Sequence, residues 1–263
     1  MSRRAIAFSC GPDTLYGTLD CAEAHGMTGL LIVSGGTEIR AGAFAGMAQL
    51  AARLAEESGV PVFRFDRRGI GDSEGEDPGW QGSHDDIAAA LAAFRAALPG
   101  MRRVVGFGVC DAASALMLHG ATLDGLVLAN PWTIDDTGDD SLGHTPGALR
   151  RRYLAKLTDP RALWRLISGQ VDLGKLLRGI NHAAQRQAAP SPLVDLLHAS
   201  LARFTGPVTL LVAQGDRGGQ RFAAVWPKDD PRVQIHPTSS HTFTDDARDW
   251  LIARLLDATA SRH

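Results

Sequence analysis

A cysteine stands where a buried strand is expected to turn directly into a helix. The apolar run 104–107 suits a strand, and residues 111–119, rich in Ala and Leu, suit a helix. Between them, residues 108–112 read Gly-Val-Cys-Asp-Ala, a pattern in which small neighbours relieve the crowding of a sharp turn around a nucleophile. The side chain of Cys110 would then lie at a helix N-terminus, where backbone N–H groups favour an anion. The pattern predicts a nucleophilic thiolate.

A cysteine nucleophile needs a base to take its proton and an acid to orient that base. An apolar strand leads into Asp216, and a later short strand is followed by His241. Nucleophile, acid and histidine then follow one another in the chain order typical of strand–turn–helix hydrolases. Asp135 and Asp136 follow the preceding strand and are alternatives for the acid.

Acyl transfer also needs N–H donors for the developing oxyanion. The predicted turn supplies the backbone N–H of Asp111. A second donor is expected from the loop after the apolar strand 30–33, where Gly35 and Gly36 permit close backbone approach. By position this donor is Thr37 or Gly36, and the alternative is a Gly-Gly turn without a catalytic role.

Composition excludes several other classes of function. A net charge of −2 disfavours nucleic acid as a partner, and no apolar run reaches the roughly 18 residues of a membrane span. The three cysteines lack C-x-x-C spacing, so neither a disulfide framework nor a zinc site is expected. There is no phosphate-binding loop, and a partial dinucleotide fingerprint at 106–111 ends in Asp. We therefore expect a cytoplasmic protein with no metal and no cofactor, acting on a small-molecule acyl substrate; the sequence does not indicate its oligomeric state.

The elements that must position these residues alternate between strand-like and helix-like segments. This alternation predicts an α/β fold with a mostly parallel sheet and helices on both faces. Two short N-terminal strands are expected to pair antiparallel. Ser83 and Asp86 resemble a capping box before one helix, and the last helix is expected from Phe243 onward.

The interval 134–204 breaks this alternation because it has helical patches but no strand-like run. It is predicted to be a helical cap over the carboxyl ends of the strands, where ligands bind in such folds. The predicted core then comprises residues 1–133 and 205–263. The alternative is a solvated helical excursion without a role.

Together these motifs resemble the α/β-hydrolase superfamily over nearly the whole chain. Four runs are similar to the exosortase A system-associated hydrolase type 1 family: Gly35-Gly36-x-x-x-Arg40-x-Gly42, Arg64-Phe65-Asp66-x-x-Gly69-x-Gly71-Asp72-Ser73-x-Gly75, Gly108-x-Cys110-Asp111-Ala112-Ala113 and Leu128-Ala129-Asn130-Pro131-Trp132.

That resemblance implies Cys110 as nucleophile, Asp216 as acid and His241 as base. It implies an oxyanion hole at Gly36 and Thr37, and substrate contacts from the matching residues Arg40 and Trp132. One departure is Arg217-Gly218-Gly219, which stands where a more apolar run is usual and leaves the acid open.

A cysteine at this position is also similar to that of dienelactone hydrolase and the polyhydroxyalkanoate synthases, which implies a thioester intermediate. The sequence thus predicts an α/β-hydrolase that cleaves an ester or thioester. An acyltransferase using an alcohol or amine acceptor, and a non-catalytic binding protein of this fold, are the alternatives.

Overall fold

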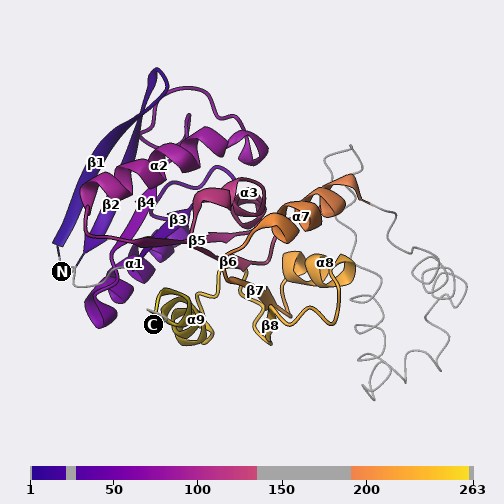
Figure 1. The fold of residues 1–263 in the computed structure, drawn as a ribbon. Coiled ribbons are helices and arrows are strands. Elements are labelled where there is room, and N and C mark those ends of the chain that lie inside the picture. Colours follow the sequence, from indigo (N-terminus) through magenta and orange to yellow (C-terminus); the bar gives the residue numbers. More distant parts are fainter. Residues whose placement is uncertain (1, 22–27, 135–190, 261–263) are drawn as a thin grey trace, which may run out of the picture.

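A single sheet of eight strands forms the centre of the computed structural model, which describes residues 2–21, 28–134 and 191–260 (Figure 1). The strand order is β1-β2-β4-β3-β5-β6-β7-β8. The strands are β1 (Ser2–Cys10), β2 (Asp13–Cys21), β3 (Thr28–Val33), β4 (Val62–Phe65), β5 (Arg103–Val109), β6 (Gly125–Ala129), β7 (Val208–Ala213) and β8 (Val233–His236). Only β1 and β2 pair antiparallel with their neighbours, so the predicted, mostly parallel sheet is confirmed.

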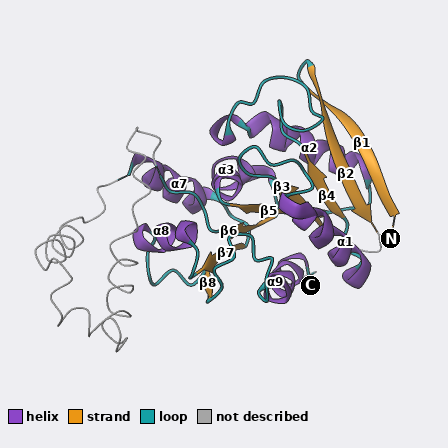
Figure 2. Ribbon diagram, turned by 180° about the vertical axis from the view of Figure 1, so that it is seen from behind, coloured by secondary structure: helices purple, strands orange, loops and turns teal. Residues whose placement is uncertain are grey.

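Helices cover both faces of this sheet (Figures 1 and 2). One face packs against α1 (Gly46–Ser58) and α9 (Arg248–Thr259). The other packs against α2 (His84–Ala97), α3 (Asp111–His119), α7 (Pro192–Arg203) and α8 (Arg217–Val225). The strands β5, β7 and β8 run in the same direction, so they end at the same edge of the sheet, and the loops that follow them converge there.

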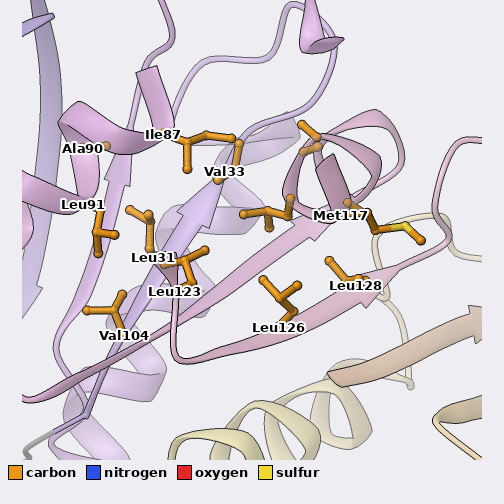
Figure 3. Close-up of a cluster of buried hydrophobic side chains, with 14 of the residues drawn as sticks. Leu31, Val33, Ile87, Ala90, Leu91, Val104, Met117, Leu123, Leu126 and Leu128 are labelled. Carbon is orange, nitrogen blue, oxygen red and sulfur yellow. The ribbon is translucent and has the colours of Figure 1, made fainter. Parts of the chain in front are cut away.

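Each face of the sheet has its own hydrophobic core because side chains alternate along a strand. In β3, Leu31 and Val33 join the cluster with α2 and α3 that Figure 3 shows, whereas Leu30 and Ile32 join the cluster with α1 and α9. All four are essentially buried. Burial on both faces explains why the parallel strands read as continuous apolar runs.

The helix α7 belongs to the core, although its residues fall within the predicted cap interval 134–204. Leu193, Leu197 and Leu201 recur every four residues, are buried, and join the same cluster as α3. Ser191 caps the helix by accepting a hydrogen bond from the Val194 N–H. The helix α7 therefore packs with the core, while the division of the chain at residue 205 stays a prediction. Residues 135–190 lie outside the described residues, so the cap itself stays a prediction.

Two local expectations were wrong. Ser83 stands at the N-cap position of α2, but its side chain makes no capping hydrogen bond, because its hydroxyl donates to the Trp80 carbonyl at 2.7 Å. The carboxylate of Asp86 is buried and pairs with Arg68, so the two residues do not form a capping box. The last helix begins at Arg248, since Phe243 has a left-handed backbone with φ of 53° in the preceding loop. Among the helices of the described residues, none has the length and apolarity that crossing a bilayer requires.

Candidate active site

Cys110 occupies the sharp turn between β5 and α3, as the sequence predicts. Its φ of 61° and ψ of −125° are unusual for a residue with a side chain, and such strain is a feature of functional sites. The Cys110 N–H donates to the Ala129 carbonyl at 2.9 Å, at the end of β6. The Cys110 carbonyl accepts from the N–H groups of Ser114 and Trp132 at 3.2 and 3.1 Å. These bonds on both sides hold the turn at the carboxyl edge of the sheet.

His241 and Asp216 meet beside this turn. Nδ1 of His241 lies 2.9 Å from Oδ2 of Asp216, and His241 and Cys110 line the same cavity. The hydrogen bond with Asp216, followed by the interaction with the neighbouring Cys110 side chain, raises the pKa of His241 to about 10. Burial acts to raise the pKa of Asp216, but hydrogen bonds from His241 and from the Gly219 N–H outweigh it, so the pKa is lowered. The alternative acids Asp135 and Asp136 lie outside the described residues.

The start of α8 fixes the carboxylate of Asp216. Asp216 is the N-cap residue of this helix, and its Oδ2 accepts from the Gly219 N–H at 3.0 Å as well as facing His241. An acid at a helix N-terminus is stabilised by the helix dipole and by the free N–H groups of the first turn. The same carboxylate therefore caps the helix and orients the imidazole.

Asn130 is a site residue that the sequence did not single out. It follows β6, is fully buried, and has a left-handed backbone with φ of 46°. Its Nδ2 donates to the His241 carbonyl at 2.8 Å, while its Oδ1 accepts from the Ala213 N–H at 2.8 Å. Asn130 thus ties the loop of His241 to the ends of β6 and β7. The sequence signal that could have indicated its role is an Asn, a residue that tolerates left-handed backbone, directly after a buried strand.

The side chain of Asp111 accepts a hydrogen bond from the loop that is predicted to form the oxyanion hole. The Gly36 N–H lies 2.8 Å from Oδ2 and 3.0 Å from Oδ1 of Asp111, and Oδ1 also accepts from the Ala112 N–H at 2.9 Å. On the opposite side of the loop, the guanidinium of Arg67 donates to the Gly36 carbonyl. Gly36 lines the cavity beside Cys110, and Thr37 is not among the lining residues.

A cavity of about 400 Å³ opens at this point. The described residues that line it are Val33, Ser34, Gly35, Gly36, Glu38, Met47, Trp80, Phe107, Val109, Cys110, Asp111, Trp132, His241 and Thr242. Trp132 is therefore at the cavity, as expected, and Trp80 is an aromatic neighbour that the sequence did not reveal.

Arg40 is not brought to the cavity. Its guanidinium forms ion pairs with Asp66 and Asp72 and donates to the hydroxyl of Thr18. Asp66 is fully buried, and a buried carboxylate needs such a partner. Arg40 is thus engaged in structural contacts. In the described ranges, no group of three or more His, Cys, Asp or Glu side chains is placed to hold a metal ion.

Comparison with known proteins agrees with this architecture. The sequence profile of the alpha/beta hydrolase family matches residues 24–254. The esterase Pf2001 of Pyrococcus furiosus is 15% identical with a TM-score of 0.61, covering 98% of this chain and 93% of that chain. The alpha/beta hydrolase GrgF of a Penicillium species is 16% identical with a TM-score of 0.62, covering 98% of each chain.

XC6422 of Xanthomonas campestris, a serine hydrolase without a lid, is 15% identical with a TM-score of 0.60 and covers 100% of this chain and 98% of that chain. None of the curated proteins matches the sequence. The structural likenesses confirm the predicted α/β-hydrolase fold.

Proposed function

The chain belongs to the alpha/beta hydrolase family, and we propose that within it the protein cleaves an ester or thioester through a cysteine-bound acyl-enzyme. The observation that carries the proposal is the pairing of His241 with Asp216 beside Cys110, which stands at the strained turn. Nδ1 of His241 faces the carboxylate, which leaves Nε2 for the nucleophile. The motif runs that resemble those of the exosortase A system-associated hydrolases support the same assignment of roles.

In the proposed reaction the Cys110 sulfur, as a thiolate beside protonated His241, attacks the carbonyl carbon. A C–S bond forms while the carbonyl π electrons move to oxygen, and the oxyanion accepts hydrogen bonds from the N–H groups of Asp111 and Gly36. Collapse of this intermediate breaks the bond to the leaving group, which takes the proton from His241. The imidazole, now neutral, takes a proton from water, whose oxygen attacks the thioester; the C–S bond breaks, which releases the acid and restores the thiolate beside protonated His241.

The protonation of His241 suits this chemistry. With its pKa raised to about 10, the imidazole is protonated at neutral pH and paired with Asp216. A protonated imidazole stabilises a neighbouring thiolate, which is the reactive form of cysteine. It is a poor base for a serine hydroxyl, so the same surroundings would serve Cys110 better than a serine.

Replacement of Cys110 tests the proposal. A chromogenic butyryl ester and a butyryl thioester would be supplied, with turnover and intact protein mass followed together. We expect a mass gain of one butyryl group on the wild type and none on Cys110→Ala, with Cys110→Ser strongly reduced in turnover. Cys21→Ser, which changes the cysteine at the end of β2, is the matched control. Undiminished turnover by Cys110→Ala would refute the proposal, as would a wild type that stays unlabelled.

Acyl transfer to an alcohol or amine is the second candidate, because it shares the whole acylation half. The cysteine at the turn favours it, since a thioester intermediate reacts readily with such acceptors. Supplying donor and acceptor together separates the two activities: a transfer product in excess over free acid supports transfer, and free acid alone supports hydrolysis. A non-catalytic protein of this fold would give neither product nor acyl-Cys110.

A further inference from the structure

The carboxylate of Asp111 occupies the hydrogen-bond donor that the proposed oxyanion needs. Both of its oxygens lie within 3.0 Å of the Gly36 nitrogen, so the N–H is already bonded before any substrate binds. We propose that Asp111 makes the enzyme selective for acyl substrates whose leaving group carries a positive charge, because that charge draws the carboxylate off Gly36 and frees the donor. This inference rests on the function proposed above.

The loop is shaped to receive this carboxylate. A Cβ at position 35 would lie 2.4 Å from Oδ1 of Asp111, so a glycine there leaves the space that the carboxylate fills. The Ala112 N–H, in the first turn of α3, adds a second backbone donor at 2.9 Å. The carboxylate of Asp111 thus lies among N–H groups beside the nucleophile, as an oxyanion would.

The loop does not depend on Asp111 for its conformation. The guanidinium of Arg67 donates to the Gly36 carbonyl, and the Glu38 N–H donates to the Gly35 carbonyl at 3.0 Å. Arg67 is itself buried. These bonds remain when the carboxylate moves, so its departure leaves the Gly36 N–H in place and unoccupied.

The rest of the cavity favours a cation as the group that releases Asp111. A second carboxylate, Glu38, lines the same cavity, and so do the indoles of Trp80 and Trp132. Among the lining residues within the described ranges there is no Lys or Arg, and His241 is engaged with Asp216. A substrate cation would be stabilised by ion pairs with both carboxylates and by cation–π contacts with the aromatic rings. A neutral group offers Asp111 no charged partner, so the carboxylate would stay hydrogen-bonded to the Gly36 N–H.

Two thioesters of the same shape test the inference. Butyrylthiocholine carries a trimethylammonium group, and S-(3,3-dimethylbutyl) thiobutyrate replaces it with a neutral tert-butyl group. We expect the wild type to favour the cationic thioester by at least about tenfold in kcat/KM. In Asp111→Asn and Asp111→Ala this preference should fall to near one. In Asp111→Ala the neutral thioester should also be turned over at least about tenfold faster, because one oxyanion donor is worth roughly 10²–10³ in kcat.

Asp229→Ala is the matched control, since Asp229 is an exposed acid that does not line the cavity. It should keep the wild-type preference. The inference is overturned if the wild type treats both thioesters alike, or if the preference survives in Asp111→Asn. It is also overturned if Asp111→Ala loses activity on the neutral thioester while Asp111→Asn keeps it, because the carboxylate then only braces the loop. Mass spectrometry separates this from a failure of the proposed function, in which neither thioester acylates Cys110.

Discussion

Gly219 lies where no side chain fits, so Gly219→Ala should disturb the acid of the site. Its N–H donates to Oδ2 of Asp216, and a Cβ would lie 2.4 Å from the Ala213 carbonyl oxygen and 2.7 Å from Oδ1 of Asn130. The first of these distances is well short of the 3.4 Å at which ordinary van der Waals contact begins. Ala213 and Asn130 are fully buried and bonded to each other, so the first turn of α8 must move instead.

Two effects on stability oppose each other in this variant. Alanine is favoured over glycine inside a helix by up to about 1 kcal/mol, whereas overpacking costs about 1–3 kcal/mol. Overpacking wins because the atom that a Cβ would meet first belongs to the backbone of β7, a strand that is paired on both sides. We expect the free energy of unfolding to fall by about 1 kcal/mol. Because a displacement of about 1 Å costs roughly 100-fold in rate, acylation of Cys110 should slow by that factor.

Urea unfolding and a time course of Cys110 acylation by intact mass measure the two effects. Gly100→Ala is the control, because a Cβ at position 100 meets nothing within 4 Å. That variant should match the wild type in both assays. If Gly219→Ala also unfolds and acylates like the wild type, the close approach of α8 to β7 does not hold Asp216 in place and the reasoning fails.

Three further expectations concern the site and its support. The raised pKa of His241 means that folding favours its protonated form, which Asp216 stabilises. The wild type should therefore be more stable to unfolding than Asp216→Asn, with the full difference from about pH 4 to pH 6.5 and a smaller one as the pH rises toward 10. Urea titrations of both proteins at several pH values measure this difference. Asn130→Asp replaces the donor to the His241 carbonyl with an acceptor, so kcat should fall at least about tenfold with KM nearly unchanged; an equal rise in KM would contradict this role. Leu197→Ala should lower the free energy of unfolding by about 2–5 kcal/mol, because this leucine is buried in the core. Leu196→Ala, at a residue that is 50% exposed, should lower it by less than about 0.5 kcal/mol. Equal losses in urea unfolding would contradict the placement of α7 in the core.

The convergence of Cys110, Asp216 and His241 could be predicted from sequence because it needs only chain order and a parallel sheet. Each residue follows a strand, and the strands β5, β7 and β8 run in the same direction, so their carboxyl ends share one edge. Fold class follows from the same alternation of strands and helices. None of this requires knowledge of how distant side chains meet.

Contacts between distant loops could not be predicted in this way. The bond between Asp111 and Gly36 joins residues 75 positions apart, and that between Asn130 and His241 joins residues 111 apart. Arg40 shows the same limit, because its motif suggested a substrate contact while the buried acid Asp66 takes its guanidinium. A motif indicates which residue types gather in a region, but the direction of each side chain depends on which partner the fold brings near.

The glycines after Asp216 show that an atypical sequence can follow from the site itself. The lack of an apolar run at Arg217-Gly218-Gly219 left the identity of the acid open. In the structure a Cβ on Gly218 would lie 3.0 Å from Oδ2 of Asp216 and 3.3 Å from Cε1 of His241, and Gly219 has no room either. At position 218 the carboxylate and the imidazole fill the space that a larger side chain would need, whereas at position 219 the Ala213 carbonyl and Asn130 do so. The glycine at 218 therefore suits a site in which Asp216 is the acid, and this part of the departure favours Asp216.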